Sequence, residues 1–158
     1  MPLLVVLMGF GPFTGEEGKE GKLPLHVTSD RMEANYGEGV VTFLGNVVAK
    51  RGDFVLTSRT LKVFLRKEGE EIEKIVAEED VKISKGERKA ACQKATYYYN
   101  EGKVVLEGNP IVWQGDNRLR GWRIVFFVNE NRALAERKGN ERVRVTIVQT
   151  EERKGAGK

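Results

Sequence analysis

The sequence predicts an all-β fold, an antiparallel jelly roll of roughly a dozen or more short strands. Three observations predict it. The chain has 19 Val, 6 Ile and 8 Thr against 9 Ala, and β-branched side chains favour strands. Apolar and polar residues alternate repeatedly, as in strands with one buried face. Gly, Asn and Asp recur between the alternating segments, where turns between short strands need them.

Alternation marks the strands in order along the chain, at residues 41–43, 54–56, 61–65, 81–83, 104–106, 124–128 and 143–145. Residues 72–83 and 88–99 are expected to pair about a turn at 85–87. Segments 132–136 and 142–149 are expected to close the fold as strands. A helical interpretation is rejected because it would place Gly and Asn at every second turn.

The length of 158 residues fits one folded domain. The composition, 40% hydrophobic and 32% charged, excludes a disordered chain. No apolar run reaches the roughly 18 residues that a membrane-spanning helix needs. The net charge of +4 is mild, and its basic clusters are either solvated strand faces or an attraction for a polyanion. No nucleic-acid-binding motif is present, so nucleic acid is not an expected partner.

Both ends of the chain lack the strand pattern. Residues 1–13 contain a short apolar run followed by Gly and Pro, which resembles the end of a truncated secretory signal peptide. A loosely packed N-terminus is the alternative. Residues 14–22 are polar and Gly-rich and are expected to form a linker, and residues 151–158 a disordered tail. The folded domain is therefore expected at 23–150.

An internal repeat runs through this domain. Residues 28–65 match residues 91–128 at a fixed offset of 63, with ten of 38 pairs identical. The shared pattern is E-G-x-V-x-x-x-G-N followed by G-D-x-x-L. Half of the identical pairs are Gly, Asn or Asp, so the repeated property is backbone geometry, which indicates a repeated supersecondary unit.

A change of strand parity repeats with it. Leu56 and Leu61 lie five residues apart, so a straight strand would turn them to opposite faces, and Leu119 and Ile124 do the same. One face can stay apolar only if the strand bends or bulges between them. The expected bends lie at residues 58–60 and 121–123. Such bends let a sheet fold over itself.

Several segments, taken in order, resemble the OstA-like family. They are LHVTSD at 25–30, VTFLGNV at 41–47, Gly52-Asp53, the strand 61–65 and VVLEGN at 104–109. The resemblance covers residues 23–148. It implies a V-shaped, two-sheet antiparallel β-jelly roll without enzyme activity. It also implies that the interior binds the acyl chains of lipopolysaccharide.

The resemblance further implies the location and the partners. The place is the periplasm. The partners are lipopolysaccharide, through its lipid A acyl chains, inner-membrane and outer-membrane transport proteins with related β-jelly-roll domains, and further copies of the chain paired head to tail. No cofactor is expected. Two alternatives stay open: a structural β-domain that polymerises by edge pairing without lipid, and an OstA-like domain of the inner-membrane partner.

Seventeen side chains are candidates for lining an apolar lipid groove. Each buried CH₂ gains roughly 0.8 kcal/mol, so acyl chains need such a cover in water. The candidates are Leu25, Val27, Val41, Phe43, Phe54, Leu56, Leu61, Val63, Leu65, Ile83, Tyr97, Val104, Leu106, Leu119, Ile124, Phe126 and Val128. The resemblance matches Leu25, Val27, Ile83, Tyr97 and Leu106 to lipid-contacting positions of the family. A packed core requires the same residue types, so core packing is the alternative for each.

Polar residues form no catalytic constellation and no metal-ligand spacing. Cys92 lies in a strand pattern and is expected to be a small buried residue. His26 alternates with apolar neighbours and is expected on the polar face. Asp30, Asp53 and Asp116 stand beside Ser or Gly and are expected to cap turns.

Bulky and basic residues raise three further expectations. The run 97–99, three tyrosines, and Trp113 are expected to narrow the interior. Trp113 and Trp122 are expected in the core or at its rim, with stacking on sugars as the alternative. The basic residues at 142–144 either protect an edge strand from pairing or lie on a strand that pairs with another copy.

Overall fold

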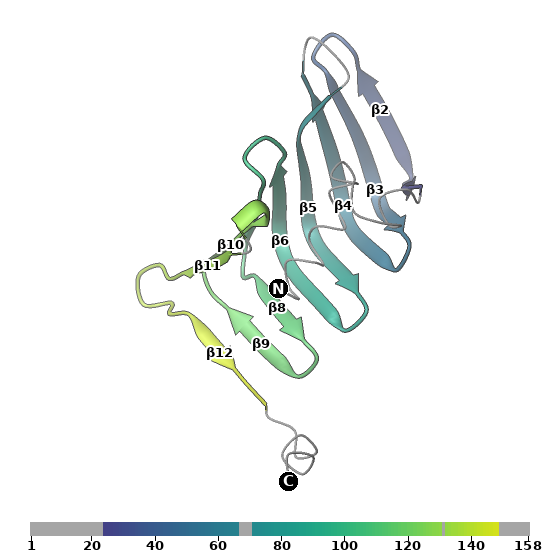
Figure 1. Ribbon diagram of the computed structural model, residues 1–158. Coiled ribbons are helices and arrows are strands. Elements are labelled where there is room, and N and C mark those ends of the chain that lie inside the picture. Colours follow the sequence, from purple (N-terminus) through teal and green to yellow (C-terminus); the bar gives the residue numbers. More distant parts are fainter. Residues whose placement is uncertain (1–23, 67–70, 131, 149–158) are drawn as a thin grey trace.

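The computed structural model describes residues 24–66, 71–130 and 132–148 and consists almost entirely of strands (Figure 1). Twelve strands form one sheet, which confirms the predicted all-β class. The first six are β1 (His26–Thr28), β2 (Arg31–Asn35), β3 (Val40–Arg51), β4 (Phe54–Leu65), β5 (Ile72–Lys85) and β6 (Arg88–Tyr98). The rest are β7 (Lys103–Glu107), β8 (Ile111–Gln114), β9 (Asn117–Arg120), β10 (Arg123–Phe127), β11 (Arg132–Glu136) and β12 (Arg144–Thr146), with a short 3₁₀-helix η2 (Val128–Glu130) after β10.

The four long strands β3 to β6 pass through both layers of the fold (Figure 1). Each is irregular near its middle, where the registers of neighbouring strands shift. On one side of these corners β2, β7, β10 and β11 complete a first layer, and on the other side β1, β8, β9 and β12 complete a second. All pairings are antiparallel. The two expected sheets are therefore the two halves of one folded sheet.

The predicted repeat is confirmed by the backbone. At the offset of 63 residues, β3 corresponds to β7 plus β8, and β4 corresponds to β9 plus β10. The corner of β3 has positive φ at Gly45 (85°) and Asn46 (47°), and the equivalent corner has the same conformation at Gly108 (83°) and Asn109 (56°). The identical Gly-Asn pairs thus encode identical corners.

Neighbouring segments of the backbone, at Asp30 and Gln93, pass very close to these two glycines. A Cβ on Gly45 would meet the Asp30 carboxylate at 2.5 Å, and a Cβ on Gly108 would collide with the Cβ of Gln93. The backbone N–H of Asp30 donates to the Gly45 carbonyl at 2.9 Å, and that of Gln93 donates to the Gly108 carbonyl at 3.1 Å. Only glycine allows both the left-handed turn and this approach.

The corners of β4 and β6 use a different device. The hydroxyl of Ser58 donates to the carbonyl of Thr60 at 2.9 Å, and the thiol of Cys92 donates to the carbonyl of Lys94 at 3.4 Å. Both bonds lie where the register of the ladder shifts. Leu56 and Leu61 are both buried despite their opposite parity, so the bend predicted at 58–60 is confirmed.

Some predicted boundaries and orientations are wrong. β10 ends at Phe127, whose partner Lys103 is the first residue of β7, so Val128 has no strand to pair with and begins η2. β12 is shorter than predicted because it pairs only with three residues of β9. Val112 packs in the interior, so Trp113 faces outwards and does not narrow the interior.

The expectations of a signal-peptide end at 1–13, a linker at 14–22 and a tail at 151–158 lie outside the described residues and stay predictions. Within the part of the chain that the structure describes, no helix has the length and apolarity to cross a membrane.

Gly108→Ala is expected to destabilise the fold more than Gly86→Ala. Both glycines have positive φ, which costs an L-residue roughly 1–2 kcal/mol. A Cβ on Gly86 would meet nothing within 4 Å, whereas one on Gly108 would strike Gln93, and such overpacking adds roughly 1–3 kcal/mol. Urea unfolding of the two variants measures the difference in the free energy of unfolding. Equal losses would contradict the close approach at the corner.

Candidate functional site

One apolar cluster fills the space between the layers. In the first layer a row of register partners crosses the sheet, namely Val41, Val63, Ile75, Tyr97, Val104 and Phe126. In the second layer the corresponding row is Val27, Ala49, Leu56, Ile83, Ala90, Val112 and Leu119. Because side chains alternate between faces, each row lies on one side of its layer, and the two rows face each other through the cluster.

More than half of the seventeen candidate residues lie deep in this cluster. Nine are at most 4% exposed, namely Phe54, Leu56, Leu61, Ile83, Tyr97, Val104, Leu106, Ile124 and Phe126. Their side chains already contact protein on all sides, as core residues do. Leu25 lies at the opposite extreme, before β1 and 41% exposed. The side chain of Val128 lies outside the described part.

The remaining candidates are half-buried, namely Val27, Val41, Phe43, Val63, Leu65 and Leu119. Four of these lie together on β3 and β4, where Val41 pairs with Val63. We call Val41, Phe43, Val63 and Leu65 the open end of the interior. Their accessible surface can still be covered by a ligand.

The repeat shows that this exposure is local. Val41, Phe43 and Val63 correspond to Val104, Leu106 and Phe126 at the offset of 63 residues, and those three are buried. The same positions are therefore closed in the second copy and half-open in the first.

Eight residues of the interior cluster were not among the predicted candidates: Val47, Ala49, Ile75, Ala77, Val81, Ala90, Ala95 and Val112. Half of them are alanines, which carry little hydrophobic signal on their own. Ile75 and Ala77 could have been predicted from the alternation in the expected strand 72–83. Both lie an even number of residues from Ile83, and the corner between them and Ile83 does not change which positions face the interior.

Burial shifts the pKa of two side chains in the interior cluster. Burial raises the pKa of the Cys92 thiol to about 12, which confirms the expected buried cysteine. Burial, with a smaller contribution from the nearby Tyr99, raises the pKa of Tyr97 to about 12. The two tyrosine rings meet edge to face, with centroids 6.0 Å apart.

A polar row borders the apolar interior at the hairpin tips of the second layer. Phe54 of the cluster pairs with Arg51 and with Lys85, and Lys85 pairs with Arg88. Register partners share a face of the sheet, so these three cations lie on the interior side. We call Arg51, Lys85 and Arg88 the basic lip.

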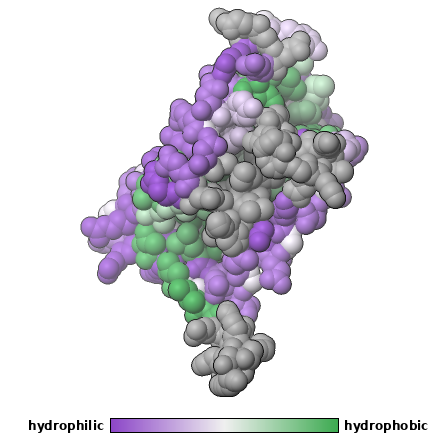
Figure 2. Space-filling model, viewed as in Figure 1, coloured by the Kyte–Doolittle hydropathy of each residue, from purple (hydrophilic) through white to green (hydrophobic). Residues whose placement is uncertain are grey.

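The exposed large apolar side chains of the described residues all lie at the two edges of the sheet. At one edge they are Leu25, Met32 and Tyr36, beside β1 and β2, and at the other they are Leu134, Val143, Val145, Ile147 and Val148, on β11 and around β12. Figure 2 shows the hydrophobic band along β12 towards the C-terminal end. Strands β1, β2, β11 and β12 each have one strand partner, so both edges carry unpaired backbone groups and apolar surface.

No group of three or more His, Cys, Asp or Glu side chains that could hold a metal ion occurs within 24–66, 71–130 and 132–148. These features define a class: a two-layer antiparallel β-fold with an apolar interior, whose side chains are partly exposed at one end, and two apolar edges.

Comparison with known proteins identifies the family. The profile of the family described as "LptA/(LptD N-terminal domain) LPS transport protein" matches residues 26–132. This match covers more than half of the chain, so the chain belongs to this family. The OstA-like resemblance seen in the sequence is thereby confirmed.

Curated relatives agree with this assignment. The chain is 27% identical over 133 residues to the lipopolysaccharide export system protein LptA of Escherichia coli K12, covering 79% of this chain and 71% of that protein. It is 28% identical over 137 residues to the lipopolysaccharide export system protein LptH of Pseudomonas aeruginosa PAO1, covering 79% and 78%. Both relatives carry names of export proteins and not of enzymes.

The fold is also that of a solved structure. The crystal structure of LptH, described as the LptA-homologous periplasmic component of the lipopolysaccharide transport device of Pseudomonas aeruginosa, matches with a TM-score of 0.70 and 22% identity. The match covers 84% of this chain and 100% of that one. The jelly-roll prediction is thus confirmed.

Cys92→Ala is expected to remove part of the alkaline sensitivity of the protein. The unfolded thiol loses its proton near pH 9.0, whereas the folded one keeps it to about pH 12. The unfolded state therefore binds fewer protons in this window, and the stability that is complete below pH 9 is lost as the pH rises, by roughly 1 kcal/mol per pH unit. Urea unfolding at pH 8 and pH 11 should show a smaller loss for the variant. Equal losses in both proteins would contradict a dry interior at Cys92.

Proposed function

We propose that this chain is a periplasmic carrier that binds lipopolysaccharide and shields its acyl chains. The observation that carries the proposal is the open end of the interior, where four apolar side chains are half-buried on the inner face of the sheet. An acyl chain laid over Val41, Phe43, Val63 and Leu65 would remove their remaining surface from water, together with its own. Each of its buried CH₂ groups would gain roughly 0.8 kcal/mol.

The arrangement of charge also suits an amphipathic lipid. The basic lip borders the apolar interior at the tips of the second layer, so the sugar and phosphate groups of a bound lipid can stay near cations and water. The acyl chains are then buried while the charged head groups stay in water, so no charged group has to enter the apolar interior. The nine deeply buried candidates serve in this proposal as the core that holds the two layers in place.

We further propose that copies of the chain associate end to end. Strand directions alternate across both layers, so β12 runs opposite to β1, and β11 opposite to β2. A second copy placed at the edge would continue both layers with antiparallel pairs. Val145, the register partner of Leu119, would continue the inner row of one copy towards Val27 of the next. Edge strands favour such pairing.

In this proposal the same edges serve for partners with related β-jelly-roll domains in the inner and outer membranes. A chain of such domains would give acyl chains a continuous apolar path across an aqueous compartment. The names of the relatives, which describe lipopolysaccharide export and a periplasmic component, support this assignment.

A photo-crosslinking amino acid placed along β4 should label lipopolysaccharide at every second position. Positions 61, 63 and 65 face the interior, and positions 60, 62 and 64 face outwards. We expect strong labelling at 63 and 65, weaker labelling at the more buried 61, and background labelling at 60, 62 and 64. Mass spectrometry of the adducts measures the pattern in the full chain.

Uniform labelling along β4 would contradict an interior site. No labelling at any position in the folded protein would favour the alternative, a structural domain that polymerises without lipid.

Val145→Asp is expected to weaken self-association at least about tenfold, because it places a charge on the inner row at the free edge. The matched control is Thr146→Asp, on the outer face of the same strand, which should change association little. Sedimentation velocity over a range of concentrations measures both. A monomeric wild-type chain, or equal effects of the two variants, would overturn the end-to-end part of the proposal.

A further inference from the structure

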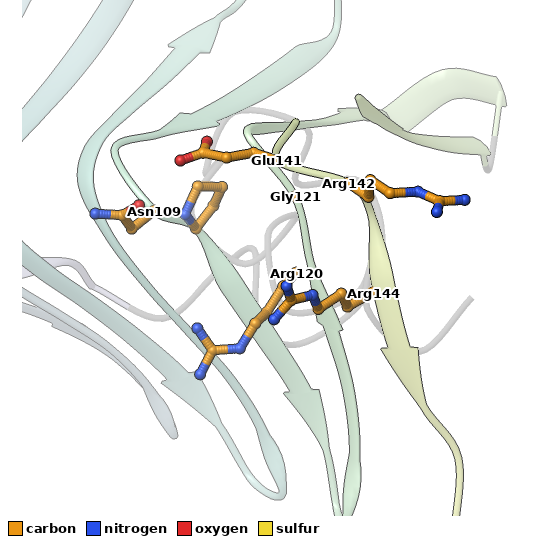
Figure 3. A pocket seen from close by; sticks show the side chains of 7 residues that line it. Asn109, Arg120, Gly121, Glu141, Arg142 and Arg144 are labelled. Atoms are coloured by element: carbon orange, nitrogen blue, oxygen red, sulfur yellow. The ribbon is translucent and has the colours of Figure 1, made fainter. Parts of the chain in front are cut away.

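A small pocket lies at the corner between the two layers, on the side away from the apolar interior. It has a volume of about 230 Å³ and is lined by Asn109, Pro110, Arg120, Gly121, Glu141, Arg142 and Arg144 (Figure 3). Arg120 belongs to β9 and Arg144 to β12, and the two are direct register partners. Their neighbours Leu119 and Val145 form the inner row, so both arginines face outwards.

The two arginines lie side by side on paired strands. In Figure 3 the side chains of Arg120 and Arg144 extend to the same side of the pocket, whereas Arg142 extends away and Glu141 lies across the pocket. Like charges directly opposite each other on paired strands are destabilising. The fold therefore holds together two cations that repel each other.

One acidic side chain, Glu141, lines the same pocket but lies across it from the pair. Neither Arg120 nor Arg144 forms an ion pair or a side-chain hydrogen bond with any residue of the described ranges. Arginines elsewhere in the same sheet do have such partners: Arg123 with Glu136 at 3.1 Å, and Arg132 with Glu130 at 2.9 Å. Two like charges on paired strands, exposed at the wall of a pocket and without an ion pair among the described residues, are an arrangement that a bound anion would stabilise.

The chemistry of the pair selects the kind of anion. Guanidinium groups bind carboxylates and phosphates through paired hydrogen bonds. A carboxylate carries one charge and would neutralise only one arginine. A phosphate monoester carries a charge of about −1.5 to −2 near neutral pH and three acceptor oxygens, so one such group can serve both arginines at once.

We infer that Arg120 and Arg144 form a binding site for a phosphate group. The site lies on the outer face beside the edge strand β12, separate from the apolar interior, and it stands independently of the proposed lipid carriage. The phosphate can belong to the free ion or to the head group of a phosphorylated lipid.

The test compares the full chain with Arg120→Gln/Arg144→Gln, and with the control Arg31→Gln/Arg59→Gln, which removes two exposed, ion-paired arginines from other parts of the sheet. Each protein is titrated with inorganic phosphate at constant ionic strength, and the arginine Nε–H NMR signals and the Tm are followed. We expect the Arg120→Gln/Arg144→Gln variant to bind phosphate at least about tenfold more weakly than the wild type. The control should bind within about twofold of the wild type.

Stability gives a second readout that a purely structural role for these arginines would not produce. In phosphate-free buffer, Arg120→Gln alone should raise the Tm by about 2 °C, because the repulsion is removed. Phosphate should raise the Tm of the wild type and of the control, but not of the double variant at the site. Equal responses of all proteins to phosphate, or a fall in the Tm of Arg120→Gln, would overturn the site.

A last comparison distinguishes the two sources of phosphate. If the group belongs to a lipid, the wild type should prefer lipopolysaccharide with its phosphates over the dephosphorylated form, and Arg120→Gln/Arg144→Gln should lose that preference. If free phosphate is the ligand, both proteins should bind both lipids equally. Failure of the wild type to bind either lipid would remove the proposed carriage and leave the phosphate titration to decide the site.

Discussion

The fold depends on one constraint: four long strands must turn a corner and still keep their apolar side chains on the inside. At each corner the ladder is interrupted, because the registers of neighbouring strands shift there. The chain solves the problem in two ways that alternate across the sheet. β3 and β5 insert two left-handed residues, Gly45–Asn46 and Glu79–Asp80, and keep the parity of their apolar positions. β4 and β6 change parity instead, each with a side-chain donor, Ser58 or Cys92, bonded to the backbone carbonyl two residues further on.

The corners in the long strands account for both the apolar cluster between the layers and the unpaired strands at the edges. Folding one sheet into two layers lets a single apolar cluster form between them without a second chain, and it leaves the first and last strands of each layer unpaired on one side. A closed barrel would have no edges. Here the edges carry the exposed apolar side chains of the described residues. The fold that shelters apolar surface inside therefore also offers it at both ends, which is the combination that a chain of linked carriers needs.

The sequence predicted the class, the repeat and the bend of β4, because Gly, Asn and strand parity act through local backbone geometry. It did not predict the corner of β5, because residues 77–82 contain no Gly or Asn, although Glu79 and Asp80 both adopt positive φ there. The outward orientation of Trp113 was not predicted either, because it depends on how the corner at Gly108 and Asn109 sets the faces of β8. Burial was the main unknown at the site: Val41 and Val104 are equivalent in the repeat, yet only the surrounding strands make one half-open and the other closed.

Nuclear Overhauser effects between acyl-chain protons and the side chains of the full-length protein test the central claim most directly. With lipopolysaccharide bound to protein labelled at its valine and leucine methyl groups, the account predicts contacts from acyl methylenes to the methyl groups of Val41, Val63 and Leu65. It predicts none to Val40 or Leu134, which face outwards. Contacts confined to the outward-facing methyl groups would contradict an interior lipid site, and so would the absence of acyl contacts to the open end.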